Sequence, residues 1–215
     1  MTRWIGVVAA IAALNTAVPA SAQSLPEEPQ APGFAAPNLR LPPRNAHGDY
    51  LTPNRDLAGH DAFWNLRIAL NVAAIGCRGP ASYQLIADYN RIIARHSPLI
   101  RSAETAVIAR LGRETGTNGI STRDKVSTRL FNYFAQPPAQ REFCRVAGSI
   151  AQQAGAMEAA PLLSMAPAML AQLDQPFVDF YHAYERYEVE LVAYRSARDF
   201  RERGQGGTML AAAKP

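Results

Sequence analysis

The most regular hydrophobic pattern in the chain begins near residue 58. Apolar side chains recur there at spacings of three and four, at Phe63, Leu66, Leu70, Ala73 and Cys77. This spacing places them on one face of an α-helix, and we expect a helix over residues 58–76. Cys77 then lies at or just past the buried edge of that helix. Pro80 is well placed to open the next helix, because proline fits the first helical turn.

The second and third helices are predicted on either side of Ser97-Pro98. Over residues 80–96 the pattern turns Tyr83, Ile86 and Ile93 inward, with either Tyr89 or Asn90 between them. Pro98 either kinks this helix or separates a third segment that reaches Leu111. The glycines within residues 112–122 indicate a loop. We expect the following helix to begin at Ser121, which with Asp124 resembles a capping box.

Two further helices are predicted around Pro137-Pro138. The first has an apolar face made by Val126, Leu130, Phe131 and Phe134, and the proline pair ends it. Pro138 can then open the second, in which Phe143, Ala147, Ile150 and Ala154 align. Cys144 stands next to Phe143, so it lies close to this second apolar stripe.

The last helix has the clearest beginning. A less regular segment rich in Ala, Met and Pro covers residues 159–171. Asp174 then has the features of an N-cap, with Pro176 in the first turn. Phe177, Tyr181, Tyr184 and Leu191 follow a period of 3.6 residues toward Arg203. Residues 205–215 are expected to form a flexible tail.

The patterns together predict an all-α protein. We find no run of alternating apolar and polar residues enriched in β-branched side chains, so no sheet is expected. The predicted fold is a helical bundle of five to seven helices in one domain, residues 58–204.

The stretch before the domain is rich in proline. Residues 23–57 contain seven prolines and few large apolar side chains. Proline removes backbone donors and disfavours helix in the preceding residue, so we expect an extended or disordered tether. Such a segment could span space in the cell envelope or lie along the surface of the domain.

The first 22 residues have the features of a secretory signal peptide. Arg3 supplies the positive charge, residues 4–14 are an unbroken apolar run, and Ala20-Ser21-Ala22 offers the small residues of a cleavage site. A run of 11 residues is too short for a membrane span, which needs roughly 20. We therefore expect cleavage before Gln23, a periplasmic or secreted location, and no transmembrane segment in the mature chain.

The predicted export affects how the two cysteines, Cys77 and Cys144, are interpreted. Two cysteines in an oxidising compartment favour a structural disulfide, here closing a loop of 68 residues. Reactive or metal-binding thiols and unpaired buried thiols are the alternatives. The spacing between them is incompatible with a C-x-x-C redox pair or a haem attachment motif.

Charge is distributed unevenly. Basic residues number 22 and acidic ones 18, which does not indicate nucleic-acid binding. Residues 78–145 carry 11 basic and 5 acidic side chains, whereas residues 146–203 carry 5 basic and 8 acidic ones. Either helices of the two parts face and neutralise each other, or the basic part docks on an anionic envelope component.

The one metal-like pattern lies in the last helix. Asp179 precedes His182 by three residues and Glu185 follows it by three, so all three can share a helical face. A dinuclear iron bundle needs two carboxylate-x-x-His pairs, and a second pair is missing. We therefore interpret His182 first as a partly exposed residue on a charged face, and keep these three residues as low-ranking metal candidates.

Other chemistry finds little support in the sequence. Met157, Met165 and Met169 could suit Cu(I), but methionine at helical spacing usually fills gaps in a core. The chain contains neither a G-x-S-x-G nucleophile motif nor a phosphate-binding glycine loop. No cofactor and no catalytic residue is predicted.

Several short motifs resemble those of a family of exported alphaproteobacterial proteins that have no characterised activity. These are Trp64-Asn65-Leu66-Arg67, residues 70–74 through Cys77, Tyr89-Asn90, residues 131–134, and Arg141 through Cys144. The resemblance covers residues 63–151 and implies a signal peptide and a paired cysteine. It brings no activity, cofactor or catalytic residue with it.

Two functional hypotheses follow. The first is a non-enzymatic periplasmic helical protein that binds or scaffolds an anionic component or another protein of the envelope. The second is a metal-binding or enzymatic helical bundle centred on the last helix.

Overall fold

The computed structural model describes the backbone of residues 27–212 and the side chains of residues 27–203. Over this range it contains six α-helices and no β-strand, which confirms the predicted all-α bundle. The helices are α1 (Gly59–Gly76), α2 (Ala81–Arg95), α3 (Ser97–Thr115), α4 (Gly119–Phe134), α5 (Gln140–Ala156) and α6 (Ala159–Ala212). The predicted signal peptide, residues 1–22, lies outside the described residues.

The chain divides into two units. The larger one, Glu28–Arg195, contains α1 to α5 and most of α6, and every site discussed below lies within it. The described helical part of the smaller one begins at Ser196. In this smaller unit the backbone is helical to Ala212, where the sequence predicted a flexible tail from Gln205.

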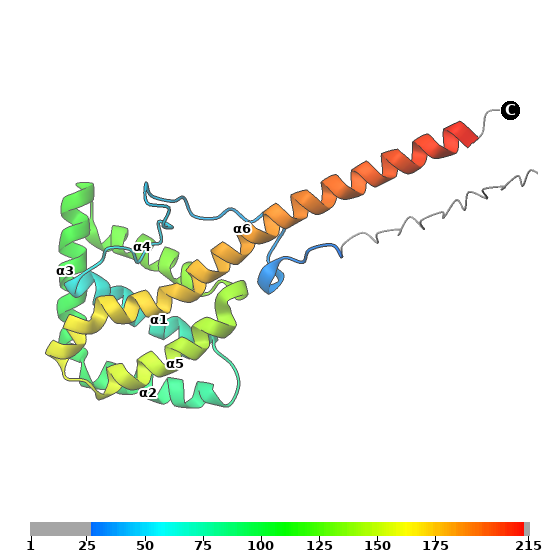
Figure 1. Cartoon of the computed structure of the whole chain (residues 1–215). Coiled ribbons are helices and arrows are strands. Elements are labelled where there is room, and N and C mark those ends of the chain that lie inside the picture. Colours follow the sequence, from blue (N-terminus) through cyan, green and yellow to red (C-terminus); the bar gives the residue numbers. More distant parts are fainter. Residues whose placement is uncertain (1–26, 213–215) are drawn as a thin grey trace, which may run out of the picture. The chain divides into compact units, whose positions relative to one another are not determined.

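The first helix is the centre of the bundle. Phe63, Leu66, Leu70 and Ala73 are buried, as their spacing predicts. The helix contacts four others, and Figure 1 shows it between the α3–α4 pair and the α2–α5 pair. Neighbours on several sides explain why α1 buries additional residues such as Ile68 and Val72, which lie off the predicted stripe.

The predicted face of the second helix is partly wrong. Tyr89 is buried and Ile93 packs against the core, as predicted, but Tyr83 is 80% exposed and Ile86 is 40% exposed. Leu85 and Ile92 are buried instead. Leu85, Tyr89 and Ile92 also have helical spacing, so the pattern alone does not distinguish the two faces. Packing against α5 selects the face that contains Leu85.

The turns between helices are set by proline, glycine and asparagine. Pro98 lies in the first turn of α3, so it separates two helices rather than kinking one. Gly116 ends α3 with a φ of 63°, a left-handed conformation that suits glycine. The next helix begins at Gly119, earlier than the predicted Ser121. Its N-cap is Asn118, whose side chain accepts hydrogen bonds from the backbone N–H groups of Ile120 and Ser121.

The last helix begins well before the predicted N-cap. It starts at Ala159 and contains both Pro167 and Pro176 in its interior. Asp174 therefore does not cap a helix; its carboxylate accepts hydrogen bonds from outside α6 instead. An aromatic cluster holds α6 on the bundle, with the Phe177 ring centroid 4.7 Å from that of Tyr133 and 5.3 Å from that of Phe143.

Residues 28–57 pack on the helices. Of the two arrangements left open for the proline-rich segment, the structure shows the one along the domain surface. The Tyr184 hydroxyl donates a hydrogen bond to the Ala36 carbonyl at 2.8 Å and accepts one from the Leu39 N–H at 3.1 Å. Near Gly33 the approach is close, because a Cβ there would lie 2.7 Å from the Cα of Pro138. Tyr50, farther along the segment, is only 3% exposed.

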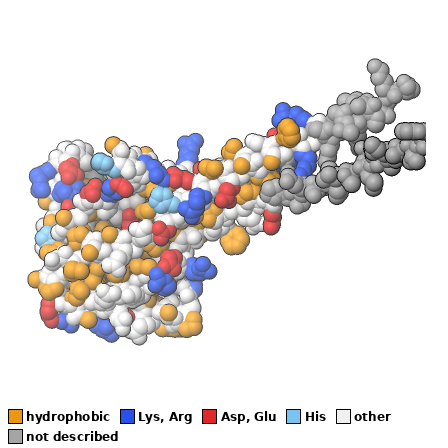
Figure 2. Space-filling view, in the orientation of Figure 1, with side chains coloured by type: hydrophobic (Ala, Val, Ile, Leu, Met, Phe, Trp, Pro, Cys, Tyr) orange, Lys and Arg blue, Asp and Glu red, His pale blue; other side chains and the backbone are white. Residues whose placement is uncertain are grey.

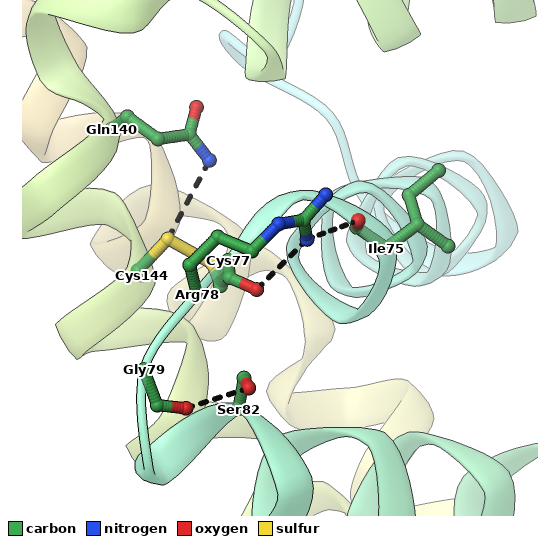
Figure 3. Close-up of a disulfide and its surroundings, with 7 residues drawn as sticks. All are labelled: Ile75, Cys77, Arg78, Gly79, Ser82, Gln140 and Cys144. Atoms are coloured by element: carbon green, nitrogen blue, oxygen red, sulfur yellow. Dashed lines mark hydrogen bonds between the residues drawn. A yellow bond between two sulfur atoms is a disulfide. The ribbon is translucent and has the colours of Figure 1, made fainter.

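Cys77 and Cys144 lie at disulfide distance, as predicted. Their sulfur atoms are 2.01 Å apart and their Cα atoms 5.7 Å apart. The bond connects the end of α1 to the first turns of α5 (Figure 3). The side-chain amide of Gln140 donates to the Cys144 sulfur at 3.5 Å, and Arg78 donates to the carbonyls of Ile75 and Cys77.

Among the described helices, none combines the length and the apolar character that a membrane crossing needs.

Candidate functional site

A polar cleft lies between residues 48–57 and α6. It encloses about 480 Å³. One wall is the end of the proline-rich segment, and the other is a stripe of α6 at helical spacing, made by Pro167, Ala171, Asp174, Gln175, Val178 and His182. The volume falls in the range of small-molecule sites. The cleft exists because the segment packs on the domain, so a free tether would leave this face of α6 open.

Asp174 is the most buried charged group of the cleft, with 9% of its surface exposed. Its Oδ2 atom accepts a hydrogen bond from the Thr52 hydroxyl at 2.6 Å. Its Oδ1 atom accepts one from the Asn54 side-chain amide and one from the Tyr133 hydroxyl, the latter at 2.8 Å. The three donors come from two distant parts of the chain, and all three are neutral.

Neighbouring groups hold these donors in place. The side-chain amide of Asn65 donates to the Asn54 side-chain oxygen at 3.0 Å, which orients the Asn54 amide toward Asp174. Burial raises the pKa of the Tyr133 phenol, and the negative charge of Asp174 raises it further. Tyr133 therefore keeps its proton and remains a hydrogen-bond donor to the carboxylate.

The rim of the cleft carries a chain of exposed charges. Arg55 forms ion pairs with Asp49, at 2.7 Å, and with Asp56, at 3.4 Å. A hydrogen bond from Asn45, followed by the charge of Arg55, lowers the pKa of Asp49. The cleft lining therefore contains three carboxylates, two at the rim and one buried, against the single guanidinium of Arg55.

The predicted metal candidates do not converge. His182 lies at one end of the cleft and half-buried, with its Nδ1 atom 3.8 Å from Glu185. The Arg44 guanidinium contacts both, forming an ion pair with Glu185 and lying 3.3 Å from His182 Nδ1. Asp179 is exposed and accepts a hydrogen bond from Gln175 instead. The Arg44 guanidinium therefore already lies between His182 and Glu185, two of the three candidates.

No group of three or more His, Cys, Asp or Glu residues within the described part of the chain is arranged to hold a metal ion.

A second cleft, of about 460 Å³, lies beside the disulfide between α2 and α5. It also contains a buried carboxylate, Asp88, which is 1% exposed. Asp88 differs from Asp174 because it has a cationic partner, with Arg91 at 2.9 Å, and it accepts a hydrogen bond from Gln84 at 3.1 Å.

Ion pairs neutralise only part of the basic stretch. Among the basic residues of the stretch 78–145, five pair with carboxylates: Arg91, Arg95, Arg110, Arg123 and Arg145. Of the described ion pairs, only Arg95 with Glu158 joins this stretch to the acidic part of the chain. Figure 2 likewise shows acidic and basic side chains interspersed on the visible face of the bundle.

The residues that line the polar cleft were not predicted from the sequence. Thr52 and Asn54 belong to the proline-rich stretch, in which no site was expected, and Asp174 has the appearance of an N-cap. His182 was singled out for a metal, and it borders the cleft without ligating partners. The available signal was the polar side chains of Thr52 and residues 54–56 at the end of the proline-rich stretch, and these give no indication of their distant partner.

Comparison of the chain with protein-family models, with curated proteins and with solved structures finds no match in any of the three.

Proposed function

We propose that this chain is a non-enzymatic, periplasmic or secreted binding protein of the cell envelope, and that it holds its partner in the cleft between residues 48–57 and α6. The observation that carries the proposal is the cleft itself, whose floor is the hydrogen-bonded Asp174. A concave site with a few convergent polar groups is the usual form of a ligand site.

The hydrogen bonds around Asp174 favour binding over catalysis. Thr52 and Asn54 line the cleft and donate to Asp174, while Asn65 and Tyr133 support this arrangement from behind the lining, so these groups define a shape rather than present an activated nucleophile. In this proposal the proline-rich segment is one wall of the site. Export rests on the signal-like sequence of residues 1–22 and on the disulfide-distance cysteine pair.

The proposal is tested by recovering partners from an envelope extract with a variant that fills the cleft. Ala171 is exposed and lines the cleft, so Ala171→Gln adds a neutral side chain there without disturbing the core. Ala168→Gln makes the same change on an exposed part of α6 that does not line the cleft, and is the matched control.

We expect a component that is recovered by the native protein and by Ala168→Gln, at low and at moderate salt, and lost with Ala171→Gln. Recovery of the same components by all three proteins would contradict a role for the cleft. Recovery of none by any of them would contradict the binding function.

A further inference from the structure

We infer that the cleft receives an ammonium group, which binds next to the Asp174 carboxylate. The inference rests on the proposed binding function and deepens it, because it assigns a chemical class to the ligand. It starts from a comparison of the two carboxylates that the structure buries, Asp88 and Asp174.

The two buried carboxylates differ in how their charge is compensated. Asp88 has the guanidinium of Arg91 at 2.9 Å. For Asp174, the described residues provide three neutral donors, and no Lys, Arg or His nitrogen lies within ion-pair distance. Burial of an ionised carboxylate is costly unless the charge is paired as well as hydrogen-bonded. The position of Asp174 on the cleft lining allows a ligand to supply the missing cation.

The surroundings of Asp174 also favour a positively charged ligand. Asp49 and Asp56 at the rim add two carboxylates, and Arg55 is the one guanidinium of the lining. A cleft lined by an excess of one sign of charge attracts ligands of the opposite sign.

The geometry also favours an organic cation over a bare metal ion. Two carboxylate oxygens of Asp174 can accept about four hydrogen bonds, and three are in use, so one acceptor position remains for an N–H donor. Leu57, Pro167, Ala171 and Val178 provide apolar surface in the same cleft, which suits the carbon skeleton of an amine. A primary ammonium on a short aliphatic chain fits both features, whether on a free amine or on a lysine-type side chain of an envelope protein.

The test is calorimetric titration of the full mature chain with defined probes. The two ammonium probes are 1,4-diaminobutane, for a free amine, and Nα-acetyl-lysine amide, for a side chain. Nα-acetyl-norleucine amide is the neutral comparison, because it keeps the aliphatic chain and lacks the ammonium. Sodium and magnesium chloride report on inorganic cations.

Three variants locate the site. Asp174→Asn removes the buried charge at nearly constant shape, and we expect it to weaken ammonium binding by roughly 10-fold or more. Asp56→Asn alters a rim carboxylate whose side chain is 85% exposed, and a loss of roughly two- to fivefold is expected. Asp179→Asn lies on α6 outside this cleft and should bind as the native protein does.

Binding of one or both ammonium probes with these losses supports the inference, and the probe that binds identifies the source. The inference is overturned if norleucine amide binds as tightly, or if Asp56→Asn and Asp174→Asn both bind unchanged. It is also overturned if magnesium or sodium alone binds in an Asp174-dependent manner. If neither ammonium probe binds while Ala171→Gln still loses an envelope partner, the ammonium site is wrong and the binding function stands.

Discussion

The Thr52 hydroxyl donates a hydrogen bond to the Asp174 carboxylate at 2.6 Å, although 122 residues separate them in the chain. Both residues are about 9% exposed and line the polar cleft, so the bond connects the proline-rich segment to α6 at the cleft. The same carboxylate also accepts hydrogen bonds from Asn54, in the same segment as Thr52, and from Tyr133 of α4. One acidic side chain therefore organises the wall and the floor of the cleft.

Replacement of Thr52 by alanine is expected to destabilise the domain. The change removes a hydrogen bond to a buried charged acceptor, and such bonds contribute about 1.5–3 kcal/mol to the free energy of unfolding. Urea denaturation followed by circular dichroism measures this loss. Thr105→Ala is the control, since the Thr105 hydroxyl bonds only its own helix in an exposed position, to the Arg101 carbonyl. Equal stability of the two variants would argue against a structural role for the Thr52–Asp174 bond.

Removal of the Tyr184 hydroxyl should loosen the proline-rich segment. Tyr184→Phe keeps the buried ring and deletes the hydrogen bonds with Ala36 and Leu39, so the segment loses an anchor while the core remains filled. We expect faster amide hydrogen exchange and faster proteolysis within residues 36–45. Tyr187→Phe is the matched control, because the Tyr187 hydroxyl bonds no other described residue. Unchanged exchange in Tyr184→Phe would show that apolar packing alone holds the segment.

Cleavage of the Cys77–Cys144 bond is expected to destabilise the protein strongly. The bond closes a loop with a sequence separation of 67 residues, for which loop-closure entropy corresponds to about 4 kcal/mol. Denaturation of the Cys77→Ser/Cys144→Ser double variant, compared with the native protein before and after reduction, measures the effect. Thiol labelling provides a separate check: two thiols should react only after reduction, and labelling of the untreated protein would contradict the bond.

Stability should fall when the pH drops below about 6.5, because of His96. This histidine is 1% exposed, and burial lowers the pKa of its imidazole in the folded state. The unfolded chain, with an ordinary histidine pKa of about 6.5, therefore binds the proton more readily than the native state. The contribution is fully present above pH 6.5 and is lost as the pH falls toward the lower, native-state pKa.

The pH effect is measured as the denaturation midpoint between pH 8 and pH 5, compared in the native protein and in His96→Gln. His96→Gln should make the denaturation midpoint less dependent on pH in the range just below pH 6.5. His47→Gln changes an exposed histidine of the proline-rich segment and should leave the slope as it is. A slope that is the same in His96→Gln would mean that other groups control acid stability.

The spacing of apolar residues predicted the parts of the fold that depend only on residues close together in the chain. The apolar stripe of Phe63, Leu66 and Leu70 gave the correct buried face of α1, because a helix surrounded by neighbours buries any continuous apolar stripe. The same reasoning failed in part for α2, where Tyr83 and Ile86 compete with Leu85 and Ile92 at equivalent spacing. Packing against the partner helix determines which face is buried. The spacing of apolar residues in α2 does not reveal where that helix lies.

The cleft was beyond prediction for a similar reason. Asp174, two residues before Pro176, is a typical N-cap in isolation, and only the folded structure brings Thr52, Asn54 and Tyr133 to its carboxylate as donors from outside the helix. The proline content of residues 23–57 predicted an extended or disordered segment, and its described part contains one short 3-10 helix, Pro32–Phe34. Proline content does not determine whether such a segment packs on a surface. Contacts such as those of Tyr184 determine this, and they arise only when α6 is in place.

The sequence by itself determined the helical class of this protein, the breaks between helices near Pro80, Pro98 and Pro137, and the expectation that Cys77 and Cys144 pair. These properties depend on residue type and short spacing. The tertiary structure alone decided that the proline-rich segment packs on α6, that Arg44 lies between Glu185 and His182, and that Asp174 is buried without a cation among the described residues. Each of these depends on groups more than 100 residues apart, whose distance is fixed only when the bundle closes.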